Sequence, residues 1–400
     1  MRKFGYQPTV LSVKNASVPL EDLTLLKEIP EGVVIERART LEPSYKTKDA
    51  VLRSNNKVGR GFARKFISNI LIPDPQILWL PGLIKKAFSL RKKTIDLIFV
   101  TAPPFSSLVA CVIIKYILEK PLVVDFRDEW VDFLAGASWS DRGKNKWISY
   151  PIERFMEKIV IKFSSSIVCA SPGYVEGFKR KYPKYTRKFT TITNGYDRDD
   201  LGSIRIKENQ KKIIKKDKFN IVYMGTVWSA TTLQYFFEGI NEMESKKDVN
   251  IIIVGRIVPD EEYVVAAHKD LEITGLGYCD HKDALALASM ADALLVTLSP
   301  FEGTDRIIPA KIFEYIALKK HIIAIVPNGS TTQILRQYSG SIIVNPAKKT
   351  EISNVCDDLV GKWKKGELLP IDEDVSIHSR EAKTEALCKV FDRVLNLCEK

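Results

Sequence analysis

The chain has 400 residues, of which 45% are hydrophobic, and a net charge of +12. This length and composition suit two or three globular domains. No apolar run reaches the roughly eighteen residues of a membrane-spanning helix without a charge or a Pro-Pro pair. No long apolar core follows Met1 as in a signal peptide, so we expect a cytoplasmic protein. The six cysteines form no CxxC or CxxxH spacing, and we expect them to be reduced packing residues.

The first predicted elements are a strand at 8–13, a short helix at 21–29 and a strand at 32–35. Residues 1–5 resemble the end of a helix with a glycine stop. The chain therefore opens with what would be the second strand of an α/β domain. We expect the first strand and the first phosphate-binding loop to be missing, either encoded upstream or replaced by another segment.

A basic and aromatic segment follows at 57–93. Residues 51–100 as a whole carry ten basic and two acidic side chains, which favours a polyanionic partner. Residues 57–72 place apolar side chains at helical spacing among lysines and arginines. Such a helix could lie on an anionic membrane, or it could be a surface helix that faces the core. No nucleic-acid-binding motif accompanies the charge, so we expect no nucleic-acid partner.

A series of strand and helix units comes next. A strand at 96–100 leads into a loop whose serines can cap a helix at 108–118. The strand at 121–124 ends in Asp125-Phe-Arg-Asp-Glu-Trp130, a polar cluster where α/β enzymes keep their chemistry. The alternative is a structural network of Arg127 with these acids. The cluster is not a metal signature, because no His or Cys lies near it in the sequence.

The remaining elements repeat the same pattern. They are a helix at 147–163, a strand at 166–170, a helix that opens at Ser171, a turn at 194–197, and a lysine-rich linker at 207–218. Strands are then predicted at 219–224, 250–254, 273–278, 294–300, 321–326 and 342–345, with helices at 232–243, 283–290 and 382–397. Gly225 and Thr226 follow the first of these strands, where backbone N–H groups can approach a phosphate. Alone this signal is weak, because glycine ends many strands.

The stretch 294–318 predicts a strand, a polar loop and a helix with Pro309 in its first turn. Lys311 and Glu314 then lie three residues apart on one helical face. A lysine there can bind a phosphate, while a carboxylate one turn later can accept hydrogen bonds from sugar hydroxyls. The alternative is an exposed ion pair on the helix surface.

Six segments in this order carry a family resemblance: TAPPFSS, PLVVDFRDEW, SPGYVE, TNGYD, VYMGTVW and IPAKIFEY. The chain resembles the retaining GT-B glycosyltransferases of the group 1 (family four) type, from bacterial polysaccharide and glycolipid pathways. The resemblance implies an α/β fold with two Rossmann-like domains that face each other across a cleft. It also implies an acceptor-side domain at 1–206, a linker at 207–218, a nucleotide-sugar domain at 219–375, and a C-terminal helix at 376–400 that returns to the first domain.

The resemblance also implies roles for individual residues. In the donor domain these are Glu314 on the ribose, Lys311 and Pro309 facing the diphosphate, Gly277 and Tyr278 at the base, and Gly225 and Thr226 in the first loop. Arg127 and Asp128 match the acceptor-side loop that reaches the reacting sugar, and together with Lys311 they are the candidate catalytic residues. Arg306 stands where the family has an acid, and the family's Arg/Lys pair after the first donor-domain strand is absent. Arg306 is therefore a further candidate for the diphosphate.

The expected activity is transfer of a sugar from a nucleotide sugar to a glycan or polyprenyl-linked acceptor, with retention of configuration. The resemblance implies no cofactor and no obligatory metal. The expected pathway is cell-surface polysaccharide synthesis, and the expected location is the cytoplasm, at the inner face of the cell membrane. The alternative is a non-catalytic scaffold subunit of a membrane-bound polysaccharide complex, which Arg306 and the missing glycine loop favour.

Overall fold

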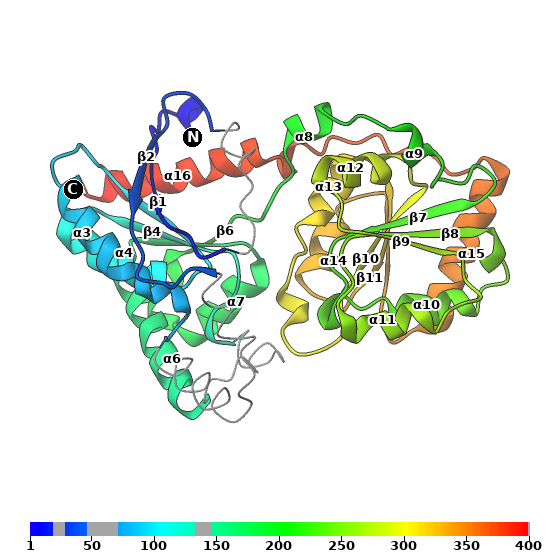
Figure 1. The fold of residues 1–400 in the computed structure, drawn as a ribbon, viewed down its shortest axis with the longest axis horizontal. Helices are drawn as coiled ribbons and strands as arrows, with labels where there is room; N and C mark the ends of the chain where they lie inside the picture. The colour runs from blue at the N-terminus through cyan, green and yellow to red at the C-terminus, as the bar shows by residue number, and fades with distance from the viewer. Residues whose placement is uncertain (19–28, 46–70, 133–145, 399–400) are drawn as a thin grey trace. The chain divides into compact units, whose positions relative to one another are not determined.

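The computed structural model describes residues 1–18, 29–45, 71–132 and 146–398. Contacts divide the chain into unit 1, with Met1–Ile192 and Thr384–Lys400, and unit 2, with Thr193–Lys383 (Figure 1). The sequence-based division instead placed a domain end at 206 and a linker at 207–218. This lysine-rich segment lies within unit 2, because ion pairs join Lys207 to Asp283 and Lys215 to Glu272. Pairs between residues so distant in sequence leave no local signal.

Unit 2 is built on a six-stranded sheet in the order β12-β11-β10-β7-β8-β9. Every neighbouring pair is parallel. The strands are β7 (Phe219–Met224), β8 (Val249–Val254), β9 (Ile273–Gly277), β10 (Ala293–Thr297), β11 (His321–Ile325) and β12 (Ser341–Val344). Their continuous apolar sequences are those of strands buried on both faces, and β7, β8 and β10 are buried along their whole length.

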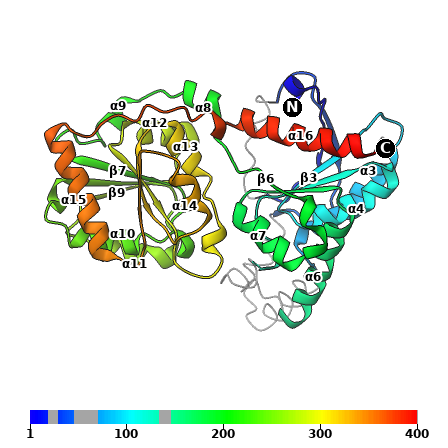
Figure 2. The same cartoon turned by 180° about the vertical axis from the view of Figure 1, so that it is seen from behind.

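Helices cover both faces of this sheet. Val222 and Leu294 point to one face, where they pack with α12 (His281–Met290), α13 (Lys311–Ala317) and α14 (Ser330–Leu335). Ile221 and Leu295 point to the other, where they pack with α10 (Gln234–Asn241), α11 (Pro259–Ala266) and α15 (Lys349–Lys365). Figure 2 shows this layered arrangement from behind. Two short helices, α8 (Arg198–Gly202) and α9 (Glu208–Lys211), precede β7.

Unit 1 contains a parallel four-stranded sheet in the order β3-β4-β5-β6. Its strands are β3 (Ile98–Ala102), β4 (Leu122–Phe126), β5 (Ser166–Cys169) and β6 (Phe189–Thr191). One face packs on α4 (Ser106–Leu118), α6 (Lys146–Phe163) and α7 (Pro172–Lys181). The other packs on α16 (Arg380–Cys398), whose Val390 and Phe391 lie against Val123 and Val168.

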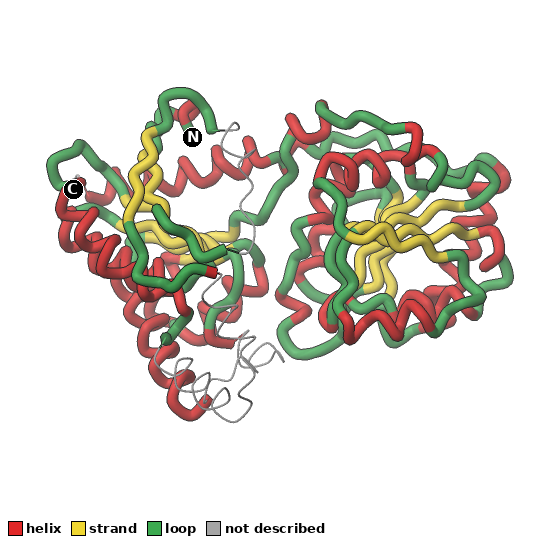
Figure 3. The backbone as a smooth tube through the Cα atoms, in the orientation of Figure 1, coloured by secondary structure: helices red, strands yellow, loops and turns green. Residues whose placement is uncertain are grey.

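The first two strands form a separate two-stranded sheet. The strands β1 (Thr9–Val13) and β2 (Val34–Ala38) are parallel and pair with Thr9 opposite Val34. Figure 3 shows this sheet in yellow beside the four-stranded one, and no ladder joins the two sheets among the described residues. The helices predicted at 21–29 and 57–72 fall outside the described ranges, apart from their last residues.

Two details of unit 1 differ from the sequence-based expectations. The helix α4 starts at Ser106. Its N-terminus is capped by Asp74, which accepts hydrogen bonds from the Ser106 backbone N–H (3.0 Å) and hydroxyl (2.6 Å). The serines do not cap this helix, because a carboxylate distant in the sequence takes that role.

None of the helices in the described ranges is both long and apolar enough to cross a bilayer.

The described part of the basic segment 57–93 makes mostly internal contacts. Trp79 donates its indole N–H to the carbonyl of Ala38 at 3.0 Å. The following helix α3 (Leu80–Leu90) buries Leu83 and Ala87 against α4. Lys86 and Lys93 both pair with Glu36, and these hydrogen bonds lower the pKa of Glu36 to about 2. Two of the cations in this segment are therefore already neutralised within the protein.

Candidate functional site

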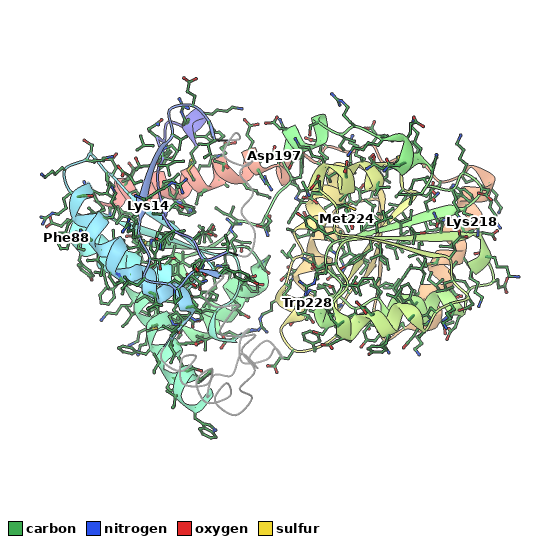
Figure 4. The ribbon with its side chains drawn as sticks, viewed as in Figure 1. Lys14, Phe88, Asp197, Lys218, Met224 and Trp228 are labelled. Carbon is green, nitrogen blue, oxygen red and sulfur yellow. The ribbon has the colours of Figure 1, made fainter. Side chains whose placement is uncertain are left out.

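The sheet of unit 2 reverses its direction of growth between β7 and β10. From β7 the chain adds β8 and β9 on one side, and from β10 it adds β11 and β12 on the other. In open parallel sheets, ligands bind outside the carboxyl ends of the strands at such a reversal. Met224 and Trp228 mark this end of β7 in Figure 4, whereas Lys218 lies at the opposite end.

Three glycines form a rim along the carboxyl ends of β7, β8 and β9. Gly225, Gly255 and Gly277 have φ values of 119°, 141° and 67°, which L side chains rarely adopt. The N–H of Gly225 donates to Val254 (2.8 Å), and that of Gly255 donates to Gly277 (2.8 Å). A Cβ on Gly255 would lie 2.2 Å from the Gly225 carbonyl oxygen. The rim therefore depends on glycine at this position, which the sequence analysis did not select.

Lys311 lies beside Gly225, the first glycine of this rim. Its Nζ is 3.6 Å from the centroid of the Tyr223 ring, and a Cβ on Gly225 would come within 3.4 Å of it. The amine is buried and has no hydrogen-bond partner among the described residues. Burial lowers its pKa to about 7, although the charge of Glu314 acts in the opposite direction. A buried amine without a partner is costly to charge, so an anion placed beside it would be strongly stabilising.

Two tyrosines hold this arrangement in place. The hydroxyl oxygen of Tyr315 accepts a hydrogen bond from the Met224 N–H at 2.9 Å and so ties α13 to the end of β7. Tyr223 donates its hydroxyl to the carbonyl of Thr226 at 3.0 Å. The ring beneath Lys311 and the loop after β7 are therefore fixed to each other. The Thr226 side chain itself is exposed.

Glu314 lies one turn further along α13, and its side chain is only 20% exposed. His281 places Nε2 at 3.4 Å from its Oε1 and at 3.7 Å from a carboxylate oxygen of Asp200. Burial raises the pKa of Glu314, and the charge of His281 opposes this rise. Lys311 and Glu314 thus face different groups and do not form the exposed ion pair that the sequence left open.

Arg306 and Pro309 lie in the loop between β10 and α13. Arg306 lies within a 3₁₀ turn, Thr304–Arg306, and its guanidinium is 3.4 Å from where a Cβ on Gly303 would be. Gly329 allows α14 to approach the same loop, since a Cβ there would be 2.0 Å from the Asp305 carbonyl. Pro309 does not occupy the first helical turn: α13 begins at Lys311, and Pro309 supplies the carbonyl that accepts from Ile312 at 3.2 Å.

The polar cluster of unit 1 is largely structural in its contacts. Arg127 donates Nε to Asp125 at 2.7 Å, and Asp125 is buried at the end of β4. Burial raises the pKa of Asp125, and the adjacent Arg127 opposes this effect. Asp128 is exposed, although the protein atoms around it raise the pKa of its carboxyl. This is the Arg–Asp pair that the structural alternative requires, and Asp128 is the most exposed of Asp125, Arg127 and Asp128.

The structure thus brings part of the predicted set together. Gly225, Lys311 and Glu314 converge at the reversal point, and Gly277 joins them through Gly255. Tyr278 is 82% exposed at the far end of the rim. His281 was missed, because a single histidine 33 positions before Glu314 carries no local signal. The described residues contain no cluster of three or more His, Cys, Asp or Glu side chains suited to a metal ion.

These features define a class of fold. Two α/β units, one with the sheet order of a dinucleotide-binding fold, match the GT-B glycosyltransferase structures over nearly the full chain. No family model and no curated protein sequence matches the chain. The fold is therefore established by structural similarity alone.

Three solved structures illustrate the match. HepE of Anabaena in complex with UDP and glucose has a TM-score of 0.63 at 13% identity, covering 96% of this chain and 99% of that one. A glycosyltransferase from Rickettsia africae has a TM-score of 0.61 at 15% identity, covering 98% and 92%. The UDP-forming trehalose-phosphate synthase of Burkholderia xenovorans, in complex with glucose-6-phosphate, has a TM-score of 0.57 at 12% identity, covering 97% and 99%.

The glycine rim leads to a first prediction. Gly255→Val should lower the free energy of unfolding by about 3 kcal/mol, because the side chain meets the Gly225 carbonyl and forces the backbone from its φ of 141°. Urea denaturation measures this change. The matched control is Gly275→Val on β9, where a Cβ meets nothing within 4 Å. Equal stability of the two variants would show that the rim tolerates side chains.

Proposed function

We propose that this protein is a retaining glycosyltransferase that transfers a sugar from a nucleotide sugar to a glycan or polyprenyl-linked acceptor. The pathway is cell-surface polysaccharide synthesis, and the reaction takes place in the cytoplasm at the inner face of the membrane. The fold is that of the GT-B enzymes, and HepE, one of the similar structures, binds UDP-glucose. The acceptor-side role of unit 1 and the donor-binding role of unit 2 belong to this proposal.

The observation that carries the proposal is the environment of Lys311. A buried amine that has no hydrogen-bond partner among the described residues faces a glycine loop at the reversal point of a parallel sheet. Glu314 lies one turn away on the same helix, with its carboxylate 3.4 Å from His281 and 20% of its side chain exposed. A cation next to a carboxylate at this spacing suits a nucleoside diphosphate, with the phosphates on Lys311 and the ribose hydroxyls on Glu314.

The proposed chemistry is electrostatic. The diphosphate gains negative charge as the glycosidic bond breaks, and Lys311 stabilises that charge without having to reorganise. Arg306 is a second candidate cation in the neighbouring loop. The acceptor hydroxyl attacks from the face that the leaving group occupies, which retains the configuration. Arg127 and Asp128 are the proposed acceptor-side residues. The carboxylate-bearing residue of this pair, Asp128, is exposed.

A ligand screen tests the proposal. We expect UDP, GDP or ADP to raise the melting temperature of the protein, and the corresponding nucleotide sugar to be hydrolysed slowly without an acceptor. Binding without hydrolysis or transfer would favour the scaffold alternative, which the pairing of Arg127 with Asp125 supports. No stabilisation by any of the three nucleotides would contradict the proposed function.

A double-mutant cycle that changes both the ligand and the protein tests the role of Glu314. The nucleoside diphosphate that binds should lose at least about tenfold in affinity when its two ribose hydroxyls are removed, since the largely covered carboxylate then loses the hydrogen bonds that the ligand donates. In Glu314→Gln this difference should shrink to about twofold. Calorimetry with the diphosphate and its 2′,3′-dideoxy form gives all four affinities. If the affinity losses from the dideoxy ligand and from Glu314→Gln are additive, the ribose hydroxyls do not contact Glu314.

A further inference from the structure

The helix α6 of unit 1 exposes an unusual number of large apolar side chains. Trp147 is 91% exposed and Phe155 is 63% exposed. Ile148, Tyr150 and Ile152 on the same helix are also exposed. At 3.6 residues per turn these positions share about half of the helix circumference. We call the exposed side of α6, formed by Trp147, Ile148, Tyr150, Ile152, Arg154, Phe155, Lys158 and Lys162, the α6 face.

The charges of α6 are sorted between its two sides. The exposed charged residues Arg154, Lys158 and Lys162 are all basic. Both acids of the helix, Glu153 and Glu157, are buried. Glu157 accepts from the Val131 N–H (3.2 Å) and the Tyr182 hydroxyl (2.6 Å), and it pairs with Lys181 at 2.6 Å. The acids are therefore used inside unit 1, and the α6 face carries positive charge alone.

The two kinds of exposed side chain occupy different parts of the α6 face. The apolar ones lie at 147–155, in the first turns, and the basic ones at 154–162, nearer the sheet. The helix extends beyond the strands of unit 1 (Figure 1, Figure 2). A helix with Trp and Phe at one end and Lys and Arg behind them can insert its apolar side chains at a bilayer interface while its cations contact lipid phosphates.

We propose that the α6 face docks unit 1 on an anionic phospholipid membrane. A second copy of this chain fits less well, because a symmetric contact would bring together two faces whose charged side chains are all basic. A nucleic acid would pair with the cations but would leave Ile148 and Ile152 without an apolar environment. A membrane surface with acidic headgroups satisfies both kinds of side chain. This docking does not depend on the proposed sugar transfer, and it uses a helix outside the basic segment 57–93.

The first experiment is vesicle flotation of the full chain without nucleotide. We expect binding to vesicles of phosphatidylcholine and phosphatidylglycerol, weak binding to phosphatidylcholine alone, and a decrease with salt. The double variant Trp147→Ser/Phe155→Ser should bind at least about tenfold more weakly. The matched control is Tyr263→Ser/Leu369→Ser, which removes two side chains of unit 2 that are 68% and 74% exposed. Equal losses in both double variants would overturn the proposal.

The charges are tested separately. Arg154→Gln/Lys158→Gln should weaken binding to the acidic vesicles by about fivefold for each charge removed. Lys212→Gln/Lys216→Gln removes the same net charge from two exposed positions of unit 2 and should have little effect. If both pairs act equally, the attraction is a property of the net charge and the α6 face is not the docking surface.

Fluorescence and sedimentation distinguish a membrane from a second copy of this chain and from a nucleic acid as the partner of the α6 face. Acyl chains brominated near the interface should quench tryptophan fluorescence in the wild type, and Trp147→Phe should lose most of this quenching while retaining vesicle binding. Circular dichroism verifies that each variant is folded. If Trp147→Ser/Phe155→Ser instead dissociates a dimer, or abolishes binding to duplex DNA while vesicle binding is unchanged, the α6 face serves another partner and the proposal fails.

Discussion

Lys311→Met is expected to reduce sugar transfer by about a hundredfold to a thousandfold, the usual cost of removing one group that stabilises developing negative charge. The variant should fold normally. Methionine has a similar shape, and it removes a buried amine that has no hydrogen-bond partner among the described residues. Turnover with the nucleotide sugar found in the screen, together with thermal melting of both proteins, measures the two effects.

The control for this variant lies at the other end of the same helix. Lys319 follows α13 and pairs with the exposed Asp372, so Lys319→Met removes an equal charge from the surface. It should leave transfer almost unchanged. Wild-type transfer in Lys311→Met would contradict the proposed role, whereas loss of transfer with loss of folding would show that the amine is structural.

The affinity for a nucleoside diphosphate is expected to fall as the pH rises above about 7. Burial lowers the pKa of Lys311 to about 7, so the amine of the free protein is charged below this pH and neutral above it. A bound diphosphate favours the charged amine, and binding at pH 8 must therefore take up a proton. The affinity should decrease by up to about tenfold per pH unit, and by about tenfold to a hundredfold in total.

Calorimetry in two buffers of different ionisation enthalpy measures this proton uptake. The difference between the wild type and Lys311→Met cancels the titration of the phosphate itself. Lys311→Arg keeps its charge throughout the range, so any binding it retains should vary with pH only as the ligand does. A wild-type profile parallel to that of Lys311→Met would exclude Lys311 from the diphosphate site.

Local sequence pattern was sufficient for most elements of the fold. The strand predicted at 219–224 is β7, and those predicted at 250–254 and 321–326 differ from β8 and β11 by one residue at an end. Continuous β-branched runs give this signal, because strands buried on both faces need no alternation. The start of α13 was misplaced by two residues, since Pro309 suits a first helical turn but here precedes it.

The site was only partly accessible to the same approach. Lys311 and Glu314 could be selected because their spacing within one helix is itself a signal. The requirement for Gly255 arises from the carbonyl of Gly225, which follows the neighbouring strand β7, and the role of His281 arises from its approach to Glu314. Both contacts exist only after the sheet has formed. The capping of α4 by Asp74 was missed for the same reason.

The division of the chain has a practical consequence for constructing fragments. Unit 2 is one continuous stretch, Thr193–Lys383, whereas unit 1 needs both ends of the polypeptide. A fragment that stops at Ile192 would lack Val390 and Phe391, which pack on one side of its β-sheet. Excision of the interior stretch is thus the natural way to isolate a half of this molecule, and a circular permutant that joins the two termini would make the other half continuous.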